Sequence, residues 1–345
     1  MRRYVLPENV NWYRANMHCH STISDGNFTP EELKEHYKNH GYSILAVTDH
    51  EVIVDHSDLN DRGFLMLTSS EYAIDQEVAP YPEVDGYPTE YWQRIKAIHL
   101  CLYAKDPHNT FHAACDESRM HWIRQPYRDE VKYDGYHREY SVDSVNETIR
   151  RLNEAGYLVQ YNHPNWSLCD RNDYLHLEGI WSLEILNYAT EMETGAEYCP
   201  YIYDEMLRNG MNVYCSMGDD NHNHGRTLEQ SFGGSTMIAA DELTYEKVIA
   251  ALEKGEFYCT SGKDDPPRIH ALYVEDNVIK VECSPAIAVM MNGYCRAFHR
   301  VTGDGITHAE FPLDPNDVYF RITVRDKFGN NAHTHAYRVA DYLEK

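Results

Sequence analysis

The sequence predicts an α/β domain followed by a small all-β domain, and two observations carry this prediction. Through residues 1–265, short apolar runs typical of buried strands alternate with segments that have the caps and spacing of helices. Repeated strand–helix–strand units favour a parallel sheet covered by helices. Beyond residue 265 the helical segments stop, and short strand-like runs follow one another between turns.

The first domain contains enough strands to favour a closed barrel over an open sheet. The predicted strands are 15–20, 44–48, 64–68, 98–103, 158–161, 183–186 and 213–217, with a further one at 235–240. Three helices are predicted at 29–39, 144–154 and 244–254. Thr29 and Pro30 form a good helix start, and each helix is followed closely by a glycine.

The remaining segments are of two kinds. Residues 75–94 and 106–140 are long for plain connections and rich in Tyr, His and Pro. They are expected either to cover a site and line a substrate pocket with aromatic side chains, or to be packed surface loops. Residues 266–345 are expected to form an antiparallel β-sandwich, with strands at 269–274, 278–283, 286–290 and 318–324 and a hairpin loop at 326–331.

Composition excludes several classes of partner. The 345 residues carry a formal net charge of −24 without a cluster of Lys and Arg, which argues against nucleic-acid polymers and anionic membranes. No run of 18 or more apolar residues is present, and the N-terminus does not resemble a signal peptide. A small anionic substrate remains compatible with this charge if bound metal ions reverse the local field.

The nine cysteines include no Cys-x-x-Cys pair. Five lie in apolar strand-like runs, which predicts buried free thiols in a reducing, cytoplasmic compartment: Cys19, Cys101, Cys215, Cys259 and Cys283. Cys19 lies between two candidate ligands, but on a strand its side chain points away from theirs.

Histidines and acids recur at the ends of apolar runs, where a barrel gathers its working residues. His18 and His20 share one face of a strand, and Asp220 and His222 repeat the same spacing. Imidazoles and carboxylates are ligands of borderline divalent ions. The sequence therefore predicts a centre of two or three metal ions. The candidate ligands are His18, His20, Asp25, His50, Glu71, His99, His163, Asp220 and His222.

These motifs resemble the PHP (polymerase and histidinol phosphatase) family over residues 12–265. The matching motifs are His18-Cys19-His20-Ser21-Thr22, Ser24-Asp25-Gly26, Thr48-Asp49-His50, Glu71, Asn162-His163-Pro164 and Asp220-Asn221-His222. The resemblance implies a distorted seven-stranded β/α barrel with up to three metal ions. It also implies a stand-alone hydrolase with a C-terminal β module.

The resemblance further implies which residues share each ion. A first ion would be held by His18, His20, Glu71 and Asp220. Glu71 would bridge to a second ion held by His99 and His163. Asp25, His50 and His222 would hold a third ion or complete the second. The family usually has a serine where this chain has Asp219, so Asp219 is expected to support a ligand or to be an alternative ligand.

Such a centre suits hydrolysis of a small phosphate mono- or diester, because paired cations clamp phosphoryl oxygens and activate a water. Zn, Mn and Fe all fit a mixed His/carboxylate site. His222 and Asp25 are the candidate catalytic residues, and the proton for the leaving group is expected from His222 or from a water on the third ion. Arg226 is the candidate substrate-binding residue, since a guanidinium can bind a phosphate or carboxylate in bidentate fashion. Arg124 and Arg128 are weaker candidates.

Three alternatives stay open. The same centre could hydrolyse a carboxylic ester, carbamate or amide. The protein could bind a glycan or partner without catalysis, with structural metals, although the candidate ligands outnumber those of a closed structural site. A nuclease or a polymerase-associated proofreader is disfavoured by the acidic charge. No dinucleotide-binding, P-loop or Gly-x-Ser-x-Gly pattern is present.

Overall fold

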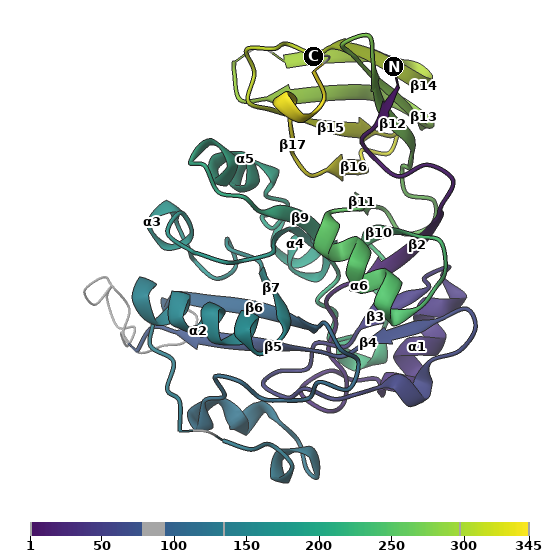
Figure 1. Ribbon diagram of the computed structural model, residues 1–345. Coiled ribbons are helices and arrows are strands. Elements are labelled where there is room, and N and C mark those ends of the chain that lie inside the picture. The colour runs from purple at the N-terminus through teal and green to yellow at the C-terminus, as the bar shows by residue number, and fades with distance from the viewer. Residues whose placement is uncertain (1, 78–93, 134, 297, 344–345) are drawn as a thin grey trace.

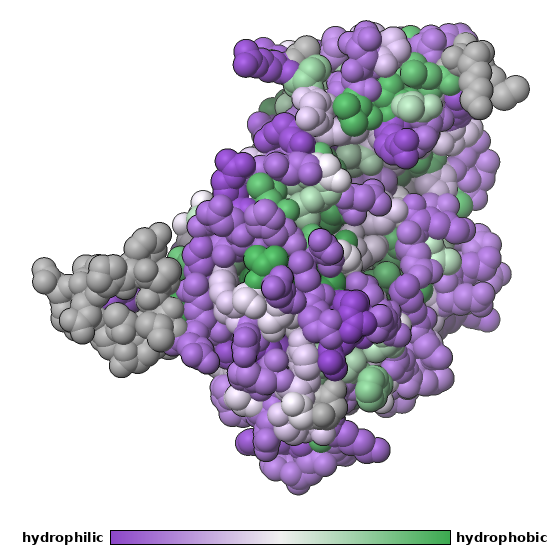
Figure 2. All heavy atoms as spheres, turned by 60° about the vertical axis from the view of Figure 1, so that its left-hand side comes forward, coloured by the Kyte–Doolittle hydropathy of each residue, from purple (hydrophilic) through white to green (hydrophobic). Residues whose placement is uncertain are grey.

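The computed structural model describes residues 2–77, 94–133, 135–296 and 298–343. It has a mixed α/β fold with two sheets, and the two ends of the chain lie close together beside the C-terminal strands (Figure 1). The face in Figure 2 is mostly hydrophilic, with small hydrophobic areas between the polar ones. No helix in the described part of the chain is long and apolar enough to cross a membrane.

The larger sheet joins strands from both ends of the chain. Its order is β1 (Arg3–Tyr4), β12 (Ile269–Glu275), β13 (Val278–Gly293), β15 (Tyr319–Arg325), β16 (Asn331–Thr334), β11 (Phe257–Ser261), β10 (Gly234–Ala240), β2 (Asn11–Asn16), β3 (Ile44–Ala46) and β4 (Leu65–Leu67). Two more strands pair at its side, β14 (Phe298–Pro312) with β13 and β17 (Tyr337–Arg338) with β15.

The second sheet has the order β5 (Ser69–Asp75), β6 (Ala97–Ala104), β7 (Tyr157–Tyr161), β8 (Ser182–Asn187) and β9 (Tyr214–Gly218). Strand β4 leads into β5 through Thr68, and one isolated bridge joins Cys19, after β2, to Asn221, after β9. The two sheets therefore meet at both of these places.

Strands β6 and β10 correct the expectation of a parallel sheet, and β10 runs antiparallel to β2. The pairs β2–β3, β3–β4, β7–β8 and β8–β9 are parallel, but β6 runs antiparallel to both β5 and β7. A fully buried apolar run is compatible with either direction, so its composition does not reveal which way the strand points. The reversal decides where the side chains at the beginning of β6 lie.

The three predicted helices are present as α1 (Pro30–Asn39), α2 (Val142–Glu154) and α6 (Tyr245–Lys254). Thr29 and Glu32 form a capping box at the start of α1, which satisfies backbone N–H groups that the helix itself leaves unpaired. Three shorter helices escaped the sequence analysis: α3 (Arg171–Tyr174), α4 (Tyr188–Thr194) and α5 (Pro200–Arg208).

The C-terminal strands continue the larger sheet, because β16 pairs with β11. The predicted strands 278–283 and 286–290 are one long strand, β13, which pairs with β12 along its first half and with β15 along its second. The predicted hairpin loop joins β15 to β16, with Asp326 accepting backbone hydrogen bonds from Phe328 and Asn330.

The N-terminal strand β1 pairs with β12, and Leu6 packs in the apolar cluster of the C-terminal strands. The first residues of the chain therefore lie with residues 266–345, across the predicted boundary at residue 265. The division into two domains stays a prediction. Eight of the nine cysteines are buried, and no disulfide joins any of the described cysteines.

Candidate metal centre

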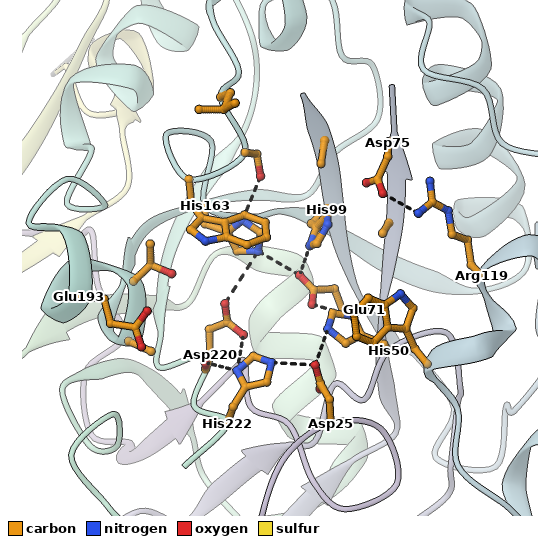
Figure 3. A pocket seen from close by; sticks show the side chains of 18 of the residues that line it. Asp25, His50, Glu71, Asp75, His99, Arg119, His163, Glu193, Asp220 and His222 are labelled. Atoms are coloured by element: carbon orange, nitrogen blue, oxygen red, sulfur yellow. Dashed lines mark hydrogen bonds and ion pairs between the residues drawn. The ribbon is translucent and has the colours of Figure 1, made fainter. Parts of the chain in front are cut away.

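The nine candidate ligands converge at one cavity of about 790 Å³. Seven of them line it (Figure 3), and His18 and His20 are buried beside them. Their nitrogen and oxygen atoms form three groups, each within 4.8 Å, that could hold a metal ion. The groups are His18, His20, Glu71 and Asp220; Glu71, His99 and His163; and His20, Asp25, His50 and His222.

The first group forms where the chain leaves β2 and β9. His18 and His20 are two residues apart, so both imidazoles point to the same side. Their Nε2 atoms lie 3.2 and 2.9 Å from Oδ1 of Asp220. The turn that follows needs Gly26, because a Cβ there would lie 2.1 Å from the carbonyl oxygen of His20. A tight backbone turn therefore brings Asp25 beside His20.

Glu71, the third residue of β5, belongs to the first and second groups and also lies beside His50 of the third. Its Oε1 lies 3.1 Å from Nε2 of His163 and 3.2 Å from Nδ1 of His99. Its Oε2 lies 3.3 Å from Nε2 of His20 and 3.3 Å from Nδ1 of His50. The two oxygens of one buried carboxylate thus face different sets of imidazoles, the arrangement of a bridging ligand.

The third group gathers around Asp25. Its Oδ2 lies 3.4 Å from Nε2 of His222 and 3.7 Å from Nε2 of His50. Its Oδ1 lies 3.6 Å from Nδ1 of His20. His20 therefore belongs to this group as well as to the first, whereas the resemblance assigned His20 to the first ion alone.

His99 reaches the centre from the beginning of its strand. His163 and Asp220 follow the ends of β7 and β9, and His50 lies beyond β3. His99 is instead the third residue of β6. Because β6 runs antiparallel to its neighbours, its beginning lies at the edge where those strands end.

The charges of the centre are strongly coupled. Burial alone would raise the pKa of Glu71, but the imidazoles of His18 and His99 hold it well below its ordinary value. Burial lowers the pKa of His18, yet the carboxylate of Asp220 raises it well above 6.5. Imidazole protons and divalent cations are therefore alternative ways of balancing the buried carboxylates.

Among the buried side-chain atoms that lack a hydrogen bond in the described part of the chain, two belong to candidate ligands: Nδ1 of His20 and Oδ1 of Asp220. A buried polar atom without a partner is costly in free energy. Both atoms belong to the candidate groups, and imidazole nitrogens with carboxylate oxygens are donors that divalent ions accept. The residues present therefore fit bound metal ions.

Further polar residues hold the ligands in place. Oε1 of buried Glu184 lies 3.0 Å from Nδ1 of His18, which directs Nε2 of that ring to the first group. Asn162 donates to Oε1 of Glu71 at 2.9 Å, and Asn187 donates to Oδ2 of Asp220 at 2.8 Å. The sequence analysis missed Glu184, although a carboxylate inside an otherwise apolar strand is a signal that could have revealed it.

Asp219 has a structural role, which corrects its interpretation as an alternative ligand. Its Oδ2 accepts hydrogen bonds from the Tyr37 hydroxyl and the Phe232 backbone, and its Oδ1 accepts one from the Gly234 backbone, each at 2.7 Å. Burial raises the pKa of Asp219 to about 6. Both oxygens are engaged in fastening the turn before β10, and Asp219 belongs to none of the three groups.

The arginine candidates lie outside the described cavity lining. Arg226 donates to Glu32 at 2.6 Å and to the Asn27 carbonyl at 2.7 Å. Neither Arg226 nor the weaker candidates Arg124 and Arg128 are among the described lining residues. Substrate binding by Arg226 stays a prediction. Its guanidinium is already paired with Glu32 and the Asn27 carbonyl. The arginine that does line the cavity is Arg119, bound to Asp75 at 2.5 Å.

Two tryptophans form part of the cavity wall. Trp122 ends the short helix η3 (Glu117–Trp122), so the segment 106–140 does contribute an aromatic ring to the pocket. Trp166 follows His163, and the sequence analysis did not single it out. The tyrosines that drew attention to these segments are absent from the described lining. Most of the segment 75–94 lies outside the described residues.

No family model matches the chain, and no curated protein matches it in sequence. Solved structures similar to it include a two-domain protein of Bacteroides vulgatus containing a predicted PHP-like metal-dependent phosphoesterase. That structure is 11% identical, with a TM-score of 0.44, over 97% of this chain and 98% of its own. The family in its name is the one that the sequence motifs resemble.

Two further similar structures are bacterial. One, from Bifidobacterium adolescentis, is provisionally named a metal-dependent phosphoesterase; it is 16% identical, with a TM-score of 0.40, over 61% of this chain and 88% of its own. The other is an amidohydrolase from Chromobacterium violaceum with bound sulfate and no metal. It is 15% identical, with a TM-score of 0.41, over 70% of this chain and 96% of its own.

Proposed function

We propose that the protein is a metal-dependent phosphoesterase that hydrolyses a small-molecule phosphate mono- or diester. The observation that carries this proposal is the buried carboxylate of Glu71, whose two oxygens face different sets of imidazoles. Two or three divalent ions, Zn, Mn or Fe, would be held by the three groups, two of which share Glu71 and two of which share His20. Bound there, the ions would clamp phosphoryl oxygens and lower the pKa of water towards neutrality.

The reaction adds water to phosphorus and breaks the bond between phosphorus and the oxygen of the leaving alcohol, which takes up a proton. In a centre with two ions, where His222 holds no metal, His222 is the proposed proton donor. It lines the cavity, and its Nε2 lies 3.4 Å from Oδ2 of Asp25. The Asp25 carboxylate would orient this ring.

We further propose that β2 to β9, with β4 and β5 counted as one strand because only Thr68 separates them, enclose the centre as a distorted seven-stranded barrel. The links at the two meeting points of the sheets support this arrangement. Beside the Cys19–Asn221 bridge, the Asp220 backbone N–H donates to the His18 carbonyl at 2.8 Å. Residues 266–345 would form a second, β-sandwich-like domain, supported by the apolar cluster that their strands share.

The function is tested with protein stripped by a chelator and reconstituted separately with Zn, Mn or Fe. A panel of chromogenic phosphate mono- and diesters is compared with carboxylic esters of the same alcohols. The proposal predicts that the chromogenic alcohol is released from a phosphate mono- or diester. Chelation should abolish this release and added metal should restore it, and the variants His18→Ala and Asp220→Ala should lack it. Metal-dependent activity confined to the carboxylic esters would contradict it.

A further inference from the structure

The cavity leaves two large rings uncovered beside the candidate ligands. Trp122 and Trp166 each retain 43% of their accessible surface. The Trp122 ring lies 5.5 Å from that of His50, and the Trp166 ring lies 5.1 Å from that of His163. The two indoles therefore flank ligands of two different groups, where the part of a substrate that leaves with the ester oxygen would lie.

Both tryptophans are held in place through their backbones and neighbours. The N–H of Trp166 donates to Oε2 of buried Glu197 at 2.7 Å. Trp122 ends η3, and Arg119 of that helix binds Asp75 of β5. Exposed indoles on anchored backbone offer a preorganised apolar surface, which lowers the entropy lost when a ligand binds.

The charges along the wall limit what else a substrate can carry. Arg119 is the lone arginine or lysine in the described lining, and Asp75 neutralises it. Glu193 accepts a hydrogen bond from Gln230 and adds a negative charge. A second anionic group would therefore find no unpaired arginine or lysine among the described lining residues. The same residues offer carboxylate oxygens that can accept hydrogen bonds from hydroxyls.

We propose that the substrate is the monophosphate of a cyclic sugar, with the sugar ring against Trp122 and Trp166; this inference depends on the phosphoesterase function above. A sugar ring presents C–H groups on its face, which pack on an indole. The hydroxyls on its edge can donate hydrogen bonds to the carboxylates of Asp75 and Glu193. A cavity of about 790 Å³ has room for such a ring as well as the phosphate.

The test compares kcat/KM for three monophosphates: a hexopyranose 6-phosphate, glycerol 3-phosphate and phenyl phosphate. Wild type, Trp122→Ala and Trp166→Ala are measured, with Phe328→Ala as the control because Phe328 is exposed on the distant β15–β16 loop. We expect wild type to prefer the hexose phosphate to glycerol phosphate at least tenfold. Each tryptophan variant should lose about tenfold on the hexose phosphate and less than twofold on glycerol phosphate.

Metal content by elemental analysis should be unchanged in both variants, which separates substrate binding from damage to the centre. Equal losses on the hexose and glycerol phosphates, or none, would overturn the role of the indoles while leaving the phosphoesterase function intact. A tenfold preference for phenyl phosphate over the hexose phosphate would overturn the sugar class. Absence of activity on every phosphate ester would refute the proposed function itself.

Discussion

Nδ1 of His18 lies 3.0 Å from Oε1 of Glu184, and both side chains are fully buried. A carboxylate on the far nitrogen of a ligand imidazole fixes the tautomer and makes the other nitrogen a better donor to a metal. Glu184 therefore positions His18 without belonging to any of the three groups.

Replacing Glu184 by Gln should weaken the first group without unfolding the protein. The amide keeps the size of the side chain but removes its negative charge, so we expect metal affinity to fall by about tenfold to a hundredfold. Competition with a chromogenic chelator measures the effect. Glu253→Gln, on the exposed surface, is the matched control. Equal affinities in the two variants would show that Glu184 does not support the site.

His99→Ala should remove one ion and leave the rest. His99 belongs only to the group with Glu71 and His163, while the first group keeps all four of its members. Elemental analysis should therefore find one ion per chain fewer than in wild type, with phosphate release greatly reduced. His108→Ala, an exposed histidine paired with Asp55, should retain the full content. An unchanged content in His99→Ala would exclude His99 as a ligand.

Removing the Arg226 side chain tests its predicted role in substrate binding directly. The pairing of Arg226 with Glu32 and the Asn27 carbonyl predicts that Arg226→Ala changes kcat/KM by less than twofold. The melting temperature should fall by no more than about 2 °C, since exposed ion pairs contribute little to stability. A tenfold loss of kcat/KM at unchanged metal content would instead support Arg226 as a substrate-binding residue.

Glu197 should make stability depend on pH. Burial raises its pKa from 4.5 to about 7, so the folded protein retains a proton that the unfolded chain releases. Its contribution to the free energy of unfolding is complete below pH 4.5 and is lost as the pH rises through 7.

As the pH rises from 5.5 to 8, wild type should therefore lose about 2 kcal/mol of unfolding free energy relative to Glu197→Gln. Urea unfolding at a series of pH values measures this shift. A difference that stays constant over the range would mean that Glu197 is already ionised in the folded protein at the lower pH.

Local signals predicted three of the helices and which side chains gather at one cavity. The caps and glycines around α1, α2 and α6 are short-range features, and the spacing of His18 and His20 fixes their common face in any extended segment. Chain direction is set by distant pairing, which explains why the reversal of β6 and the pairing of β1 with β12 could not be predicted.

The same limit applies to the surroundings of the centre. Asp219 and Asp220 are adjacent acids, and the sequence gives no reason for one to fasten backbone while the other faces the ligands. The difference depends on Tyr37 and Phe232, which approach Asp219 from remote parts of the chain. The exposure of Trp122 and Trp166 in one cavity is likewise a property of the assembled fold.

The central claim is that the three groups, which Glu71 and His20 link in pairs, hold divalent ions together. Elemental analysis of the protein purified without chelator tests it most directly. The proposal predicts two or three ions of Zn, Mn or Fe per chain, whereas less than one ion per chain would contradict it.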